Sequence, residues 1–216
     1  MNAVDFCARF VFVAFLFPAS LVFAADEPQT ILLPKPRMEG GKPLLQTLKE
    51  RKSVRDFKTD PLAPQVLSDL LWAGFGVNRP EIDHRTAPST MNMQEIDVYV
   101  ATAGGLFIYD AKPHQMRLVG SGDLRARTTG QAELKQAPVA LILVADYARM
   151  AKAKPEQREA YAYIDAGFIS QNIYLFCASE GLATVVHDLD RASLAPGMKL
   201  RQDQKIIIAQ AVGYPK

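Results

Sequence analysis

Basic and hydroxyl side chains that could bind an anion gather within five positions of the chain. Arg51, Lys52, Ser53 and Arg55 follow a short amphipathic stretch. A guanidinium group binds two phosphate oxygens at once, while a lysine adds a point charge and a serine a short hydrogen bond. The cluster therefore indicates a phosphate-binding site. The alternative is a solvated basic face at a helix end, which is common among charged clusters.

A second group of polar side chains lies in a loop at residues 85–94. Pro88 fixes the entry to the loop, and Ser89, Thr90 and Asn92 follow it. Their hydroxyl and amide groups can hydrogen-bond a planar heterocycle or a ribityl chain. The same residue types also favour turns that cap the next element, so a purely local role is the alternative.

The elements that must position these groups are those of one α+β domain. We expect a mixed, mainly antiparallel sheet of about four to five strands, flanked by helices. Leucines at helical spacing precede the basic cluster, and a continuous apolar run at 139–145 is typical of a strand covered on both faces. The expected helices are a short one from Leu44, and others at 66–75, 122–136 and 156–179, the last capped by Gly181; the expected strands are 96–101, 139–145, 184–186 and 206–212, with a hairpin of 106–109 and 116–119.

The N-terminus has the pattern of a secretory signal peptide. Arg9 precedes an apolar run at 10–23, which is shorter than the ~20 residues of a membrane-spanning helix. We predict a Sec-type signal at 1–24 with cleavage after Ala24, a proline-rich lead-in at 25–43 and a domain at 44–216. The predicted location is periplasmic or secreted, without stable membrane insertion. Because Asp5 offsets Arg9, an uncleaved N-terminal anchor is the alternative.

Charge and cysteine content exclude several functional classes. A net charge of +2 lacks the basic excess of a nucleic-acid-binding protein. Only Cys177 remains after cleavage, so an intrachain disulfide is impossible, and its apolar neighbours indicate a buried structural cysteine. The three histidines are too scattered to indicate a metal site. We also find no pattern of a Ser-His-Asp triad, a Cys-His pair or paired catalytic carboxylates.

Four motifs in order resemble those of the FMN-dependent nitroreductase superfamily. They are the basic run RKSVRDF at 51–57, the loop APSTMNMQ at 87–94, the helix segment DAGFISQN at 165–172 leading into EGLAT at 180–184, and the ending AVGYP at 211–215. The match spans residues 44–216. The hairpin and the overall layout are most similar to the branch that includes thiazoline and oxazoline dehydrogenases.

The resemblance implies a nitroreductase-like fold that binds FMN at a homodimer interface. By position, the basic cluster would bind the phosphate and ribityl chain, and the polar loop would line the flavin from the partner subunit. The backbone at the end of the 184–186 strand would lie near flavin N5. The implied cofactor-binding residues are Arg51, Lys52, Ser53, Arg55, Pro88, Ser89, Thr90, Asn92, Val185, Val186, His187 and Asp188. For His187 a solvent-facing position at the strand end is the alternative.

The implied chemistry is ping-pong transfer of hydride or electrons through flavin N5, with NADH or NADPH as the implied donor and a small molecule as acceptor. No protein side chain is then required as nucleophile or acid-base catalyst. Many family members continue past the final motif to a basic pair that completes the phosphate site. This sequence ends at Lys216, so either that lysine replaces the pair or phosphate binding is weaker. The physiological substrate is not recognisable from the sequence, although residues 78–85 and the segment after the hairpin are expected to border the flavin and to set the substrate. The rival hypothesis is a periplasmic binding or structural protein that keeps the fold without redox activity.

Overall fold

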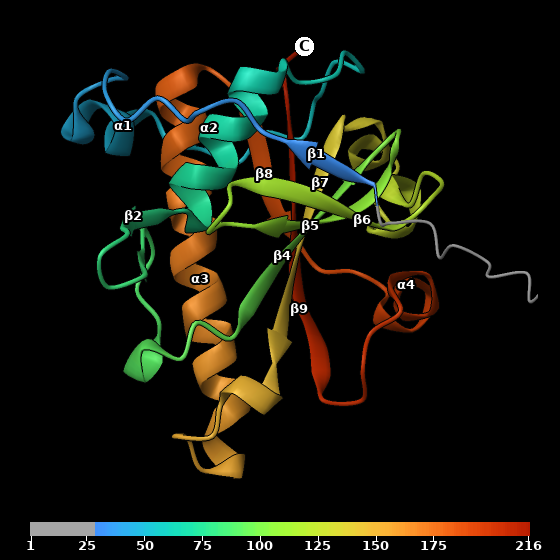
Figure 1. Ribbon diagram of the computed structural model, residues 1–216. Coiled ribbons are helices and arrows are strands. Elements are labelled where there is room, and N and C mark those ends of the chain that lie inside the picture. Colours follow the sequence, from blue (N-terminus) through green and yellow to red (C-terminus); the bar gives the residue numbers. More distant parts are fainter. Residues whose placement is uncertain (1–28) are drawn as a thin grey trace, which may run out of the picture.

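The computed structural model describes residues 29–216, so the predicted signal peptide and its cleavage site lie outside the described residues. A seven-stranded sheet runs through the centre, with helices on both faces (Figure 1). The strand order is β1-β6-β5-β4-β7-β9-β8, and all neighbouring pairs are antiparallel. The bounds of the strands are β1 Thr30–Leu32, β4 Ile96–Thr102, β5 Gly105–Asp110, β6 Gln115–Gly120, β7 Val139–Asp146, β8 Ala183–His187 and β9 Gln204–Gly213.

The predicted α+β class is confirmed, but four to five strands was too low a number. Strand β1, which is absent from the predicted ranges, has only three residues and lies in the proline-rich lead-in, where periodicity carries little signal. It pairs with β6 of the β5–β6 hairpin and forms one edge of the sheet. A separate two-stranded ribbon is formed by β2 (Val77–Arg79) and β3 (His84–Arg85), which overlaps residues 78–85.

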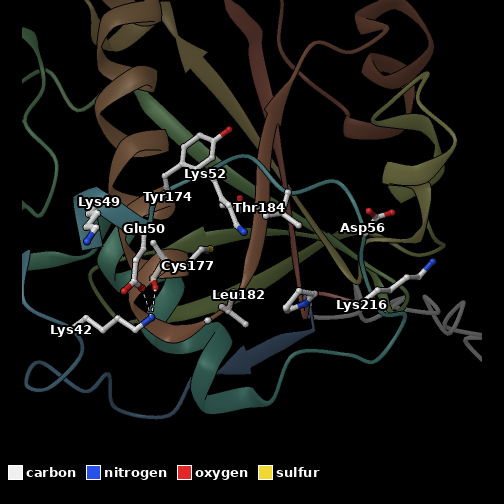
Figure 2. Close-up of a pocket in the computed structure, with 14 residues that line it drawn as sticks. Lys42, Lys49, Glu50, Lys52, Asp56, Tyr174, Cys177, Leu182, Thr184 and Lys216 are labelled. Atoms are coloured by element: carbon white, nitrogen blue, oxygen red, sulfur yellow. Dashed lines mark hydrogen bonds and ion pairs between the residues drawn. The ribbon is translucent and has the colours of Figure 1, made fainter. Parts of the chain in front are cut away.

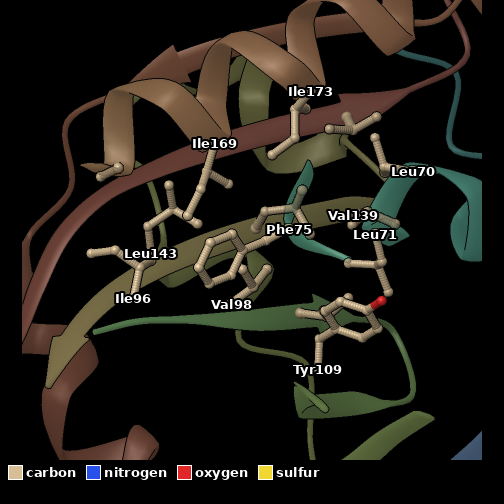
Figure 3. Close-up of a cluster of buried hydrophobic side chains, with 14 of the residues drawn as sticks. Leu70, Leu71, Phe75, Ile96, Val98, Tyr109, Val139, Leu143, Ile169 and Ile173 are labelled. Carbon is tan, nitrogen blue, oxygen red and sulfur yellow. The ribbon is translucent and has the colours of Figure 1, made fainter. Parts of the chain in front are cut away.

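Helices α2 (Pro64–Phe75) and α3 (Pro155–Glu180) cover one face of the sheet. Figure 3 shows their apolar side chains against those of the strands, with Leu70 and Phe75 from α2 and Ile169 and Ile173 from α3. All four side chains are almost fully buried. Alternation along β7 sends Leu141 and its second neighbours to this face and the intervening residues to the other.

The opposite face is covered in part by α4 (Arg191–Met198), which the sequence pattern did not indicate. Asp190 caps this helix by accepting hydrogen bonds from the amides of Ala192 and Ser193. Leu194 and Met198 are its buried side chains. The short helix α1 (Leu44–Glu50) precedes the basic cluster and packs near the second half of α3.

Two expectations about helices had different outcomes. Gly181 ends α3 in the left-handed conformation, with φ of 72°, which confirms the predicted cap. The expected helix at 122–136 was wrong, because this stretch contains only the 3-10 turns η2 (Arg125–Arg127) and η3 (Glu133–Gln136). Its few apolar residues do not repeat at helical spacing, so no continuous face could be buried.

The lead-in is fastened to the domain by polar contacts. Arg37 donates to the nearly buried carboxylate of Asp69 from both its backbone amide and its Nε, at 2.8 and 2.7 Å. Ser68 donates to the carbonyl of Pro34 and also contacts Nε2 of His114 at 2.7 Å. These bonds hold residues 30–37 against α2 and the β5–β6 hairpin. In the described residues, no helix has the length and apolar character needed to cross a membrane.

Candidate functional site

The basic cluster leaves α1 at Arg51 and runs as an extended segment beside the ends of two strands. The amide of Val54 donates to the carbonyl of Thr184 in β8, and the amide of Lys58 donates to the carbonyl of Tyr214 beyond β9. Phe57 is 1% exposed and anchors the segment. A Cβ on Gly213 would lie 2.5 Å from Cδ of Pro138 and 3.2 Å from the Phe57 ring, so this close approach requires glycine.

Tyr174 of α3 joins the basic segment to β8. Its hydroxyl lies 2.9 Å from Oγ of Ser53 and accepts a hydrogen bond from the amide of Val186, also at 2.9 Å. The guanidinium of Arg51 lies over the same ring, 5.3 Å from its centroid. One side chain thus brings together two of the groups singled out in the sequence. Tyr174 itself was missed, because it sits in an apolar helical pattern that gives its hydroxyl no signal.

A cavity of about 650 Å³ adjoins this segment (Figure 2). Side chains alternate along an extended chain, and Lys52, Val54 and Asp56 line the cavity whereas Arg51, Ser53 and Arg55 do not. Lys52 is therefore separated from the other members of the predicted phosphate site. Lys216 also lines the cavity, and its Nζ donates to Oε1 of Gln136 at 3.2 Å.

None of the cations in the basic cluster is neutralised by a carboxylate within residues 29–216. Arg51, Lys52 and Arg55 form no ion pair there. By contrast, Lys42 at the cavity rim pairs with Glu50 at 2.7 Å. Unpaired cations beside an exposed serine hydroxyl are a donor set that suits a phosphate.

The end of β8 offers its backbone more than its side chains. Val185 and His187 are buried, Val186 is half-buried and Asp188 is exposed. Nδ1 of His187 donates to the carbonyl of Asp188 at 3.0 Å, and burial lowers the pKa of the imidazole. Asp188 pairs with Arg191 at 2.9 Å. The alternative of a solvent-facing His187 side chain was wrong, since the ring is 6% exposed and lies in the interior.

The polar loop is fastened to α3 through Thr90. The amide and hydroxyl of Thr90 donate to the two carboxylate oxygens of Asp165, at 2.7 and 3.1 Å. Oγ of Ser89 accepts from the amide of Gln94, which is the local turn role that was the alternative. Pro88 and Asn92 are exposed, and the Asn92 amide lies 3.1 Å from Nε2 of His84.

One chain does not bring the polar loop and the basic segment together. The loop meets α3 at Asp165 and the basic segment meets it at Tyr174, nine residues further on, or about 14 Å along the helix axis. The outer surfaces of α1 and α3 carry large exposed apolar side chains, namely Leu44, Leu45, Leu48, Tyr163, Ile164 and Phe168.

The chain is similar in sequence and in fold to known proteins. The profile of the Nitroreductase family matches residues 48–214. A crystal structure from Ralstonia eutropha JMP134, described as that of a nitroreductase, is 42% identical over 87% of this chain and 90% of that one, with a TM-score of 0.83.

Two more distant structures share the fold alone. One, described as a nitroreductase in complex with FMN from Desulfovibrio desulfuricans, is 21% identical over 82% of this chain and 88% of that one, with a TM-score of 0.58. The other is a chain of the Escherichia coli microcin synthetase McbBCD complex with truncated pro-MccB17 bound. It is 18% identical over 95% of this chain and 85% of that one, with a TM-score of 0.67.

Proposed function

Because the chain belongs to the nitroreductase family, we propose that it is an exported FMN-dependent oxidoreductase that works as a homodimer. The observation that carries the proposal is the set of unpaired cations and the Ser53 hydroxyl, held next to the backbone of β8 by Tyr174. A phosphate suits the cations, and the amide-rich strand end suits the polar edge of a flavin ring.

In the proposed site the residues divide the work of binding. Arg51, Ser53 and Arg55 hold the phosphate and the adjoining ribityl chain, with Lys52 and Lys216 adding positive charge from the neighbouring cavity. The backbone from Val185 to Asp188 faces the ring edge near N5. Bound FMN supplies hydride and electron transfer, and the protein orients the ring and excludes water.

The homodimer supplies the second half of the site. Pro88, Ser89, Thr90 and Asn92 reach the flavin of the other subunit, which explains why they lie far from the basic segment of their own chain. The exposed apolar side chains of α1 and α3 form the dimer interface. Their burial would stabilise association by roughly 25 cal/mol for each Å² removed from water.

The compartment to which the protein is exported determines which electron donors are available to it. A Sec-type signal at 1–24 delivers an unfolded chain to the periplasm or the exterior, where the flavin is acquired after folding. NADH or NADPH is the donor in the simplest scheme. Outside the cytoplasm a membrane or protein electron carrier would replace it, or a substrate would reduce the flavin and oxygen or a quinone would reoxidise it. Residues 78–85, which include most of the β2–β3 ribbon, border the substrate.

The test is the colour of the purified protein, followed by titration with FMN. The double variant Arg51→Ala/Ser53→Ala should weaken FMN binding about 100- to 10,000-fold, since each charged hydrogen bond to phosphate contributes roughly 1.5–3 kcal/mol and two are lost. Arg117→Ala/Ser121→Ala removes an exposed arginine and serine elsewhere and should bind FMN normally. A colourless protein without affinity for FMN would refute the proposal.

A second measurement separates an enzyme from a binding protein that only keeps the fold. The flavin-loaded protein is mixed with NADH, NADPH or dithionite and then with nitroaromatics, quinones or oxygen. Transfer of electrons to any of these acceptors supports the enzyme. Tight FMN binding without any transfer would favour the periplasmic binding or structural protein.

A further inference from the structure

Glu95 is a fully buried carboxyl group at the start of β4, directly after the polar loop. Its side chain has no exposed surface. Neither carboxyl oxygen has a hydrogen-bond partner among the described residues. An isolated buried carboxylate is strongly disfavoured, so the neutral, protonated form is the stable one in this position.

The neighbour of Glu95 on α3 is Asp165, which is 1% exposed. Both oxygens of Asp165 accept hydrogen bonds from Thr90, one from the amide and one from the hydroxyl. Hydrogen bonds donated to a carboxylate favour its charged form. Of the two buried carboxyl groups, Glu95 is therefore the one without donors in the described part of the chain, and it carries the proton.

The nearby cation Arg149 is already paired and would not neutralise an ionised Glu95. Arg149, in the 3-10 turn η4 (Tyr147–Arg149), donates to the backbone carbonyl of Glu95 at 2.8 Å. Its guanidinium is already paired with Asp97 at 2.6 Å and with Asp146 at 3.4 Å. Ionisation of Glu95 would thus place an unpaired charge beside Asp165, at the anchor of the loop.

We propose that Glu95 is a positioning residue whose proton keeps the loop of Ser89 to Asn92 anchored on Asp165, so that flavin retention depends on pH. The inference rests on the proposed function, because it assigns this loop to the flavin of the partner subunit. Protonated Glu95 lets Asp165 hold Thr90. Ionised Glu95 repels Asp165 and competes with it for the amide and hydroxyl of Thr90. The loop then detaches from α3.

The pH range and size of the effect follow from the environment of Glu95. Burial is the main cause that raises the pKa of Glu95 to about 7, and the neighbouring Asp165 adds to the shift, although the backbone amide of Glu95 and the charge of Arg149 act against it. If FMN binds only the protonated form, about 3% of the protein is competent at pH 8.5, and the apparent Kd rises about 30-fold from its value at pH 6.

The experiment measures FMN affinity between pH 6 and pH 8.5 for the wild type and Glu95→Gln. Glutamine keeps the shape and donates an N–H at every pH, so its affinity should stay nearly constant. Glu159→Gln removes an exposed carboxylate of α3 and should follow the wild type. Equal pH profiles for the wild type and Glu95→Gln would overturn the inference while leaving the proposed function intact.

A readout without flavin separates failure of the inference from failure of the proposed function. Hydrogen exchange of the peptide 86–95 in the apoprotein is compared between the wild type and Glu95→Gln at each pH. If the wild type exchanges faster than Glu95→Gln at pH 8.5 but not at pH 6, ionisation of Glu95 releases the loop. This result supports the inference even if FMN does not bind. Equal exchange of the two proteins at pH 8.5 would refute it.

Discussion

Replacing Glu95 with glutamine should change how the stability of the apoprotein depends on pH. Glu95 is fully buried, and its carboxyl group has no compensating charge of its own. In the unfolded chain the group returns to its ordinary pKa of 4.5, whereas in the folded protein the pKa is about 7. The folded state therefore binds this proton more tightly than the unfolded state does.

The sign and magnitude follow from this difference. The contribution of Glu95 to the free energy of unfolding is fully present below pH 4.5 and declines as the pH rises to about 7. A shift of this size corresponds to about 3 kcal/mol, at 1.36 kcal/mol for each pKa unit. Glutamine does not titrate. The free energy of unfolding of Glu95→Gln, relative to the wild type, should therefore increase by about 3 kcal/mol between pH 4.5 and pH 7.5.

Urea denaturation at several pH values measures this quantity directly. The slope with urea concentration should be the same for both proteins, because the surface exposed on unfolding is unchanged. Asp165→Asn should lower the pKa of Glu95 and reduce the pH dependence, whereas Glu159→Gln should leave it as in the wild type. A constant difference between wild type and Glu95→Gln across the pH range would refute the reasoning about the buried pair.

The remaining predictions concern the site and its supports. Tyr174→Phe should lower the free energy of unfolding by about 1–3 kcal/mol, because the amide of Val186 loses its acceptor, and thermal denaturation that matches the wild type would contradict this. Gly213→Ala should destabilise the protein by about 1–3 kcal/mol through collision with Pro138, measured by urea denaturation. Phe168→Glu should turn the proposed dimer into monomers in sedimentation velocity, since it places a charge in the proposed interface. Cys177 is fully buried and its thiol pKa is raised by burial, so a thiol reagent should react with it only after unfolding.

The large elements were predictable from sequence because each depends on a local pattern. The β-branched and aliphatic run of β7 and the apolar spacing of α3 follow directly from the burial of these elements. The glycine after α3 marks the end of the helix. Strand β1 and helix α4 were not predicted, since three residues among prolines and a helix containing Pro196 carry little periodicity. Their formation depends on partners, β6 for β1 and the second face of the sheet for α4.

The candidate site was predictable only in part, for a related reason. The type and spacing of Arg51, Ser53 and Arg55 reveal a binding segment, but not that Lys52 points into a separate cavity. The residues that hold the site in place, Tyr174 and Asp165, lie inside a helix where their polar atoms meet partners far along the chain. Such contacts are set by the tertiary fold, and a single sequence does not encode them in any local pattern.

The fastening of the basic segment to the far end of the chain has a consequence for how the protein is made. Val54 is bonded to Thr184, Lys58 to Tyr214, and Phe57 forms a β-bridge with Pro215. Closing so long a loop is slow and becomes possible only when both ends are available. During synthesis, residues 51–58 therefore stay unfastened until the final strand forms, and the proposed phosphate site is completed only after Tyr214 and Pro215 have emerged.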